Sequence, residues 1–146
     1  MTKGKKMEPY KHTVHYYETD KMGITHHSNY IRWMEEARVD FLRKIGWDYA
    51  RMEEEGVISP VLAVECEIKK STKFDEDVYI RTRILEMGPI KMKFEYMMED
   101  SEGKHVARGI SKHCFIGPTG VPMRLNRSKP EFYEEMKKLC EEGKQD

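Results

Sequence analysis

The chain has 146 residues, with Lys plus Arg and Asp plus Glu both at 26, so its formal net charge is zero. This balance argues against a basic nucleic-acid-binding face, and we expect no nucleic-acid partner. No apolar run approaches the ~20 residues that a transmembrane helix needs, so no membrane partner is expected either. The length fits one domain, predicted over residues 1–146, with residues 1–9 as a flexible tail.

The hydrophobic pattern changes its period near the end of a glycine-containing loop. Before the loop, His12–Glu18 is rich in aromatic and β-branched residues and predicts a first strand. The loop ends at Ser28 and Asn29, either of which can cap a helix. From Tyr30–Ile45 the apolar residues recur every three or four positions, which predicts an amphipathic helix that ends at Gly46.

The rest of the chain reads mainly as β-structure. A short helix is expected over Trp47–Glu55, and the expected strands that follow are Val57–Ile68, Val78–Leu85, Ile90–Met98 and His105–Ile116. The last three strands are joined by short turns and predict an antiparallel meander. Apolar residues at helical spacing predict a C-terminal helix over residues 130–143. These elements imply an α+β fold in which the long helix buries its apolar stripe against the sheet.

The cysteine and histidine spacing gives no sign of a disulfide framework or a metal site. Cys66, Cys114 and Cys140 are odd in number and widely spaced, which suits a reducing cytoplasm. On the predicted first strand, His12 and His15 would point to opposite faces, and no further ligand set completes a site. We therefore expect a cytoplasmic protein with no metal.

The segment between the first strand and the long helix carries the candidate chemistry. Asp20 follows the strand, Gly23 lies in the loop, and the helix begins shortly afterwards. The first turn of a helix has backbone N–H groups without intrahelical partners, and these can polarise a carbonyl and stabilise an oxyanion. Asp20 could attack that carbonyl or activate a water molecule. An ordinary turn aspartate is the alternative at this position.

The segment TDKMGITHHSNYIRWMEEAR resembles the signature of the 4-hydroxybenzoyl-CoA thioesterase family of hotdog-fold proteins, in particular its YbgC/FadM-like acyl-CoA thioesterase branch. The positions that meet the family pattern are Tyr16 or Tyr17, Thr19, Asp20, Gly23, His27, Asn29, Tyr30, Glu35, Ala37 and Arg38. Two later blocks, KSTKFDED and GKHVARGISKHCFIGPTGVPMRL, also resemble the family, so the resemblance spans most of the chain.

This resemblance implies a hotdog fold, in which a five-stranded antiparallel sheet wraps around a long central helix. It implies homodimers or homotetramers that share active sites and hydrolyse an acyl-CoA to free CoA and a carboxylic acid. Asp20 would be the nucleophile or general base, and His27 would direct its backbone N–H at the thioester carbonyl. Tyr16, Gly23 and Asn29 would contact the substrate. No cofactor is expected, because CoA is part of the substrate.

Several charged residues outside this loop are further candidates. Arg124 and Arg127 could bind the phosphates of CoA, although solvated surface charges are the alternative. Glu35 lies on the helix that carries the catalytic carboxylate in some other hotdog branches. We expect it instead to make a buried hydrogen bond or an ion pair with Arg38.

Other functions compatible with the same fold stay open. They are a thioesterase acting on acyl carrier protein, a non-catalytic acyl-CoA-binding protein, and a dehydratase, whose pattern this chain does not resemble. Ser71 and Thr72 stand where many relatives carry Pro-Ala, which leaves the acyl preference open.

Overall fold

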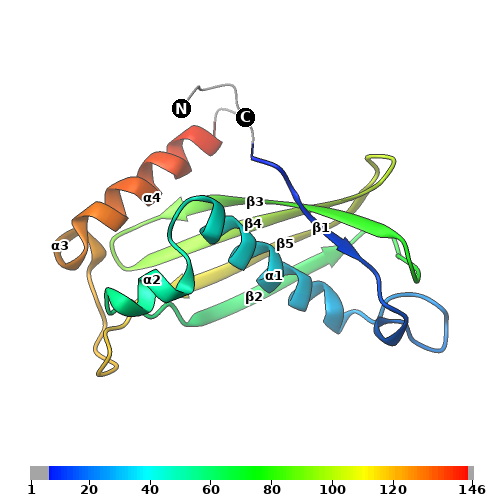
Figure 1. The fold of residues 1–146 in the computed structure, drawn as a ribbon, viewed down its shortest axis with the longest axis horizontal. Helices are drawn as coiled ribbons and strands as arrows, with labels where there is room; N and C mark the ends of the chain where they lie inside the picture. The colour runs from blue at the N-terminus through cyan, green and yellow to red at the C-terminus, as the bar shows by residue number, and fades with distance from the viewer. Residues whose placement is uncertain (1–6, 145–146) are drawn as a thin grey trace.

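A five-stranded antiparallel sheet is the main feature of the computed structural model, which describes residues 7–144. Its strands are β1 (Tyr10–Thr13), β2 (Val61–Ile68), β3 (Asp77–Met87), β4 (Lys91–Asp100) and β5 (His105–Cys114). They lie in the order β1-β3-β4-β5-β2, so the expected meander forms the centre of the sheet (Figure 1). Of the tail expected over residues 1–9, residues 1–6 lie outside the described residues.

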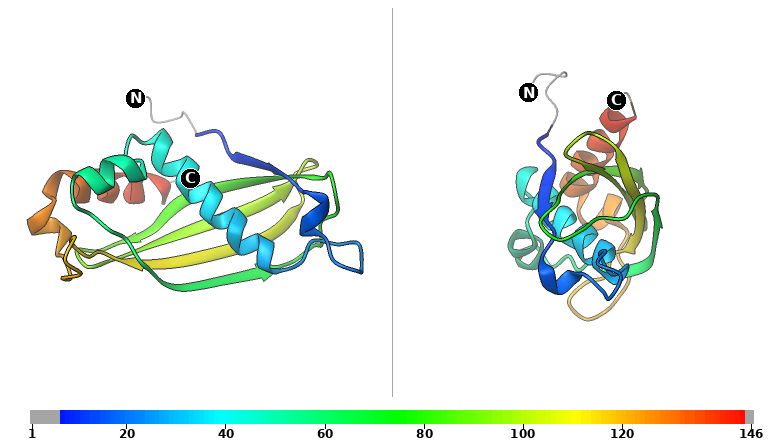
Figure 2. Two further views of the ribbon diagram at one scale, coloured as in Figure 1. Left: turned by 60° about the horizontal axis from the view of Figure 1, so that its bottom comes forward. Right: turned by 90° about the vertical axis from the view of Figure 1, so that its right-hand side faces the viewer.

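The long helix α1 (Ser28–Lys44) crosses one face of the sheet, and the strands curve around it (Figure 2). Its buried apolar residues recur at helical spacing and are Tyr30, Trp33, Met34, Ala37, Phe41 and Leu42. This is the amphipathic stripe expected from the sequence. The arrangement is the hotdog architecture and confirms the α+β expectation.

A glycine on β5 lets the helix approach the sheet closely. A Cβ atom at Gly109 would lie 2.6 Å from Met34 Sδ and 2.8 Å from Met34 Cε. Carbon and sulfur atoms do not approach so closely without displacement. Met34 is itself buried in the core, so this glycine sets how deeply α1 sits.

The central strands alternate between the core and the outer face of the sheet. On β3, Val78, Ile80 and Ile84 are buried, as the alternating pattern predicted. The buried apolar residues of β4 are Met92, Phe94, Tyr96 and Met98.

Three further helices close one end of the molecule. They are α2 (Tyr49–Glu54), α3 (Leu125–Ser128) and α4 (Pro130–Gly143). The ring of Phe132 on α4 packs edge-on against Trp47 with centroids 4.8 Å apart, and Met136 is fully buried. None of the helices in residues 7–144 is long and apolar enough to span a membrane.

The first predicted strand was wrong in its extent. β1 ends at Thr13, and Tyr16–Glu18 forms a short 3-10 helix, η1. The Glu18 side chain accepts a hydrogen bond from the His15 backbone N–H at 2.8 Å. This bond stabilises the turn in which the chain leaves the direction of β1. Residue composition favoured a strand here, but this contact is specific to the folded chain.

Candidate active site

The candidate site lies where η1 leads through a loop into the start of α1, at the right of Figure 1. The loop is closed on itself, because Thr19 and Thr25 form an isolated β-bridge. Inside it, the Asp20 N–H donates to the Ile24 carbonyl and the Gly23 N–H donates to the Asp20 carbonyl, both at 2.9 Å. Gly23 has a φ of +79°, a conformation that side chains disfavour, which explains the glycine at this turn.

The Asp20 carboxylate is half-buried and uses one oxygen to hold the turn. Oδ1 accepts a hydrogen bond from the Met22 N–H at 2.8 Å. Within residues 7–144, Oδ2 has no hydrogen-bond partner. The carboxylate is therefore oriented by the loop while one oxygen stays available.

The start of α1 presents a backbone donor. The N–H of Asn29 donates to the His26 carbonyl at 3.0 Å, that of Tyr30 donates to the His27 carbonyl at 3.2 Å, and that of Ser28 meets His26 Nδ1 at 3.3 Å. The His27 N–H has no acceptor among the described residues. This donor lies at the positive end of the helix, so it can interact with a carbonyl oxygen. The His27 ring is exposed and stacks on His26 with centroids 4.3 Å apart.

The other residues expected to bind substrate lie close by in the chain but differ in exposure. Tyr16 on η1 is 76% exposed and contacts Phe74 edge-on, with ring centroids 5.7 Å apart. Asn29 is buried, and its Nδ2 donates to the backbone carbonyls of Glu18 at 3.0 Å and His26 at 3.2 Å. The Asn29 amide thus holds the loop against the helix.

The arginines proposed for CoA are not near this loop within one chain. Arg124 and Arg127 are exposed at α3. In Figure 1, α3 lies at the opposite end of the molecule from the loop that leads into α1.

The expected pair between Glu35 and Arg38 was wrong. Glu35 is exposed, whereas Arg38 is buried and donates to the hydroxyls of Tyr49 at 3.2 Å and Tyr96 at 2.9 Å. The two residues occupy neighbouring helix positions, but Arg38 turns into the core and Glu35 faces solvent. This buried contact depends on strand β4, which the local pattern on the helix does not reveal.

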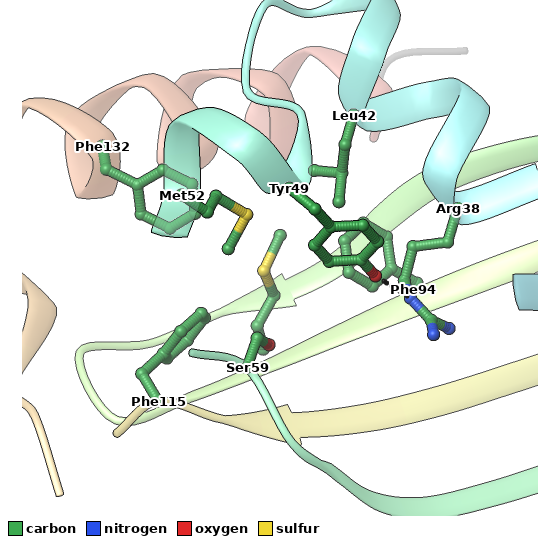
Figure 3. Close-up of a pocket in the computed structure, with 9 residues that line it drawn as sticks. Arg38, Leu42, Tyr49, Met52, Ser59, Phe94, Phe115 and Phe132 are labelled. Carbon is green, nitrogen blue, oxygen red and sulfur yellow. Dashed lines mark hydrogen bonds between the residues drawn. The ribbon is translucent and has the colours of Figure 1, made fainter. Parts of the chain in front are cut away.

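Arg38 lines a mostly apolar pocket that Asp20 does not line (Figure 3). Its lining residues are Arg38, Leu42, Tyr49, Met52, Ser59, Met92, Phe94, Phe115 and Phe132. Behind it, Tyr96 bonds Ser111 at 2.7 Å, and Ser111 bonds His113 at 2.8 Å. Burial, reinforced by the charge of Arg38, lowers the pKa of His113 to about 4, so this imidazole is neutral near pH 7.

The argument against a metal site also needs correction. Because η1 turns the chain back, the rings of His12 and His15 lie 5.3 Å apart. Their nitrogens and a Glu18 oxygen all lie within 4.8 Å of one another, a grouping that could hold an ion. The absence of a metal stays an expectation. The reason given for it, that His12 and His15 point to opposite faces of a strand, does not hold.

Glu18 is the residue that sequence reasoning missed. It is 5% exposed and accepts hydrogen bonds from the His15 N–H and the Trp33 indole, both at 2.8 Å, with His12 Nε2 also 2.8 Å away. Burial alone would raise the pKa of Glu18, but the hydrogen bonds from His15, His12 and Trp33 and the charge of His12 lower it to about 2. Glu18 directly precedes Thr19 and Asp20, which was the signal that the sequence offered. We assigned it to the predicted strand and therefore did not consider it as a site residue.

A second buried contact ties the loop to the chain before β3. The Thr25 N–H donates to the Thr72 carbonyl at 2.8 Å, and the two hydroxyls lie 2.7 Å apart. The Tyr30 hydroxyl bonds Thr72 Oγ1 at 3.0 Å, and burial raises the pKa of this phenol. Thr72, one of the departures from the family pattern, is therefore part of the support of the loop.

Comparison with known proteins places this geometry in a family. Residues 14–138 match the model of the Thioesterase-like superfamily. The chain belongs to this superfamily. It is a thioester hydrolase with the hotdog fold. The narrower YbgC/FadM-like branch stays a prediction.

Three relatives illustrate the similarity. A Bacillus subtilis protein named as a candidate acyl-CoA thioesterase, YneP, is 32% identical over 129 residues, covering 86% of this chain and 94% of that protein. The structure of a DHNA-CoA thioesterase from Staphylococcus aureus has a TM-score of 0.86 at 32% identity, covering 94% of this chain and 93% of the other. The structure of the BH1999 gentisyl-coenzyme A thioesterase has a TM-score of 0.73 at 26% identity, covering 82% and 96%.

Proposed function

We propose that this thioesterase hydrolyses acyl-CoA, with Asp20 as nucleophile or general base and the His27 N–H as the donor to the thioester carbonyl. The observation that carries the proposal is the loop itself. It begins with a carboxylate that keeps one free oxygen and ends at a backbone donor that is unpaired among the described residues. Acyl transfer needs a base or nucleophile together with an oxyanion donor.

The chemistry needs no group beyond these residues and water. The His27 N–H would donate a hydrogen bond to the developing oxyanion at the positive end of α1. Asp20 would either attack the carbonyl carbon, giving a mixed anhydride that water then hydrolyses, or take a proton from a water molecule that attacks directly. In both routes the C–S bond breaks, CoA leaves as its thiolate and takes up a proton, and the acyl group leaves as a carboxylic acid.

An aromatic acyl group is our first choice of substrate. Relatives of this chain are named for DHNA-CoA and gentisyl-CoA. The exposed rings of Tyr16 and Phe74 lie beside the loop and offer apolar surface to a planar acyl group.

The edge strand β2 supports the expected homodimer. Its apolar side chains are unusually open, with exposed fractions of 49% for Val61, 50% for Leu62, 37% for Val64 and 41% for Ile68. β2 pairs with β5 on one side only, and an exposed apolar edge is suited to a second copy.

A two-fold antiparallel pairing of β2 edges would bring opposite ends of two copies together. The α3 end of one copy, with Arg124 and Arg127, would then approach the Asp20 end of the other. We keep these arginines as CoA-phosphate ligands on that basis. We also propose that the protein works in the cytoplasm, because Cys66, Cys114 and Cys140 are all unpaired thiols, which suits a reducing compartment.

The test is thiol release from a panel of acyl-CoAs that runs from acetyl to palmitoyl and includes benzoyl and 1,4-dihydroxy-2-naphthoyl. Asp20→Asn keeps the side-chain shape and removes the charge. We expect the variant to lose at least ~100-fold in rate, equal to ~2.7 kcal/mol of activation barrier.

Asp40→Asn is the matched control, because among residues 7–144 the Asp40 carboxylate pairs with Lys44 alone, at 2.8 Å on the helix surface. It should keep the wild-type rate. Equal hydrolysis by wild type and Asp20→Asn would remove Asp20 from the mechanism. Binding of acyl-CoA without hydrolysis by the wild type would favour a non-catalytic role or an acyl carrier protein substrate.

A further inference from the structure

Glu18 is the buried centre of a polar cluster that the proposed chemistry does not use, and within it the His15 side chain is 52% exposed. The cluster consists of Glu18, His12 on β1, His15 before η1 and Trp33 on α1. Glu18 Oε1 meets His12 Nε2 and the His15 N–H at 2.8 Å, with His15 Nδ1 at 3.3 Å, and Oε2 accepts from the Trp33 indole at 2.8 Å. The carboxylate therefore joins the strand, the turn and the central helix.

The backbone of Glu18 makes a second set of contacts with the helix start. Its carbonyl accepts from the His26 N–H at 2.8 Å and from Asn29 Nδ2 at 3.0 Å. His26 and Asn29 flank His27, and Asp20 follows Glu18 by two positions. Glu18 lies where the loop begins, and these bonds tie it to the start of α1, where the loop ends.

Asp20 has no comparable contacts of its own. Within residues 7–144, Asp20 forms hydrogen bonds with Met22, Gly23 and Ile24, and all three lie inside the loop. Such bonds hold the shape of the loop but not its place on the protein. That place depends on the contacts of Glu18 at one end and of Thr25 at the other.

The surroundings of Glu18 require a carboxylate. His12 lies between two of them, because its Nδ1 is 3.3 Å from Glu36 Oε1, which itself accepts from the Tyr10 hydroxyl at 2.7 Å. Each ring nitrogen of His12 therefore lies within 3.3 Å of a carboxylate oxygen. An amide at position 18 has only one oxygen, so its NH₂ group would face either the Trp33 indole N–H or the His15 backbone N–H. A buried donor facing a donor is costly, so the cluster should open.

We propose that Glu18 is a positioning residue that holds the Asp20 carboxylate in place relative to the His27 N–H. The proposal rests on the function proposed above. A displacement of about 1 Å at a reacting group can cost about 100-fold in rate, so opening the cluster should act mainly on kcat.

The experiment compares Glu18→Gln with Glu95→Gln. Glu95 is a matched control, because it is also a buried carboxylate, 6% exposed, and is held by Arg83 at 2.6 Å and Arg108 at 2.8 Å. It lies on β4, away from the loop. Measurements of kcat and KM for acyl-CoA hydrolysis are made well below the Tm of each variant.

We expect Glu18→Gln to lower kcat by about 10- to 100-fold, with KM changed less than kcat. Trp33→Phe, which removes one donor, should fall between this variant and the wild type. Glu95→Gln should keep its kcat even if its Tm falls as far. A kcat that follows Tm equally in both glutamate variants would reduce Glu18 to a structural residue and overturn the proposal.

Amide hydrogen exchange over residues 19–27, followed by mass spectrometry, separates this proposal from the proposed function. Faster exchange in Glu18→Gln but not in Glu95→Gln supports the positioning role, even if the wild type hydrolyses no acyl-CoA. Unchanged exchange together with unchanged kcat would overturn it.

A metal site is the other use of the same cluster. Zinc ions are added alone to chelator-treated wild type and to His15→Ala. A rise in Tm that is specific to the wild type would show that the cluster binds a metal, and would overturn the positioning role. No difference between the two proteins supports the hydrogen-bonded cluster.

Discussion

The buried carboxylate of Glu18 makes a specific prediction about stability in acid. Its pKa is lowered from 4.5 to about 2 in the folded protein. A carboxylate with a lowered folded pKa stabilises the fold above its unfolded pKa, and this contribution is lost as the pH falls toward the folded pKa. The shift corresponds to about 3 kcal/mol in the free energy of unfolding. Because the side chain is 5% exposed, solvent screens this contribution little.

The prediction is checked by urea unfolding of wild type and Glu18→Gln at a series of pH values from 7 to 2, followed by circular dichroism. The glutamine cannot ionise, so the gap in free energy between the two proteins should narrow by about 3 kcal/mol between about pH 5 and pH 2. Glu131→Gln, at a surface position with a 75% exposed side chain, serves as the control. A gap that stays constant over this range would refute the description of Glu18 as a buried carboxylate stabilised by its donors.

Two other substitutions test the core. Gly109→Ala places a methyl group 2.6 Å from Met34 Sδ, so we expect a loss of about 1–3 kcal/mol in urea unfolding. The double variant with Met34→Ala should lose less stability than the sum of the two single variants, because the smaller side chain removes the overlap. An unchanged midpoint would mean that Met34 moves aside freely. For His113 the folded pKa of about 4 lies below the ordinary 6.5, so the unfolded chain binds the proton first and stability falls as the pH drops from 6.5 to 4. His113→Gln should flatten the curve over that window, and an equally steep curve would contradict the burial argument.

The two pH windows overlap between about pH 5 and pH 4 and belong to different parts of the molecule. His113 reports on the core at the α2 and α4 end, whereas Glu18 reports on the support of the candidate site. Comparing Glu18→Gln and His113→Gln with the wild type therefore assigns each part of the pH dependence of stability to one of these two groups. The activity of Glu18→Gln can then be compared with its stability at the same pH.

Local sequence determined the elements with strong periodicity and the place of the candidate site. The apolar spacing from Tyr30 onward was sufficient for α1, which begins at Ser28, because an amphipathic helix must bury one stripe. The alternation around Val78 and Ile80 placed the correct face of β3 in the core. The motif from Asp20 to Asn29 located the loop, since residue types and spacing within one short segment are visible in sequence.

Only the tertiary structure decided which polar groups meet. Glu18 could not be connected to Trp33 from the pattern, because their contact depends on the turn at His15 and on the angle at which α1 crosses the sheet. Arg38 was assigned to a neighbour on its own helix, whereas it bonds Tyr96, 58 positions later in the chain. Local propensity describes how each segment folds. Buried polar groups take whichever partners the packing brings to them, because each must be hydrogen-bonded once water is excluded.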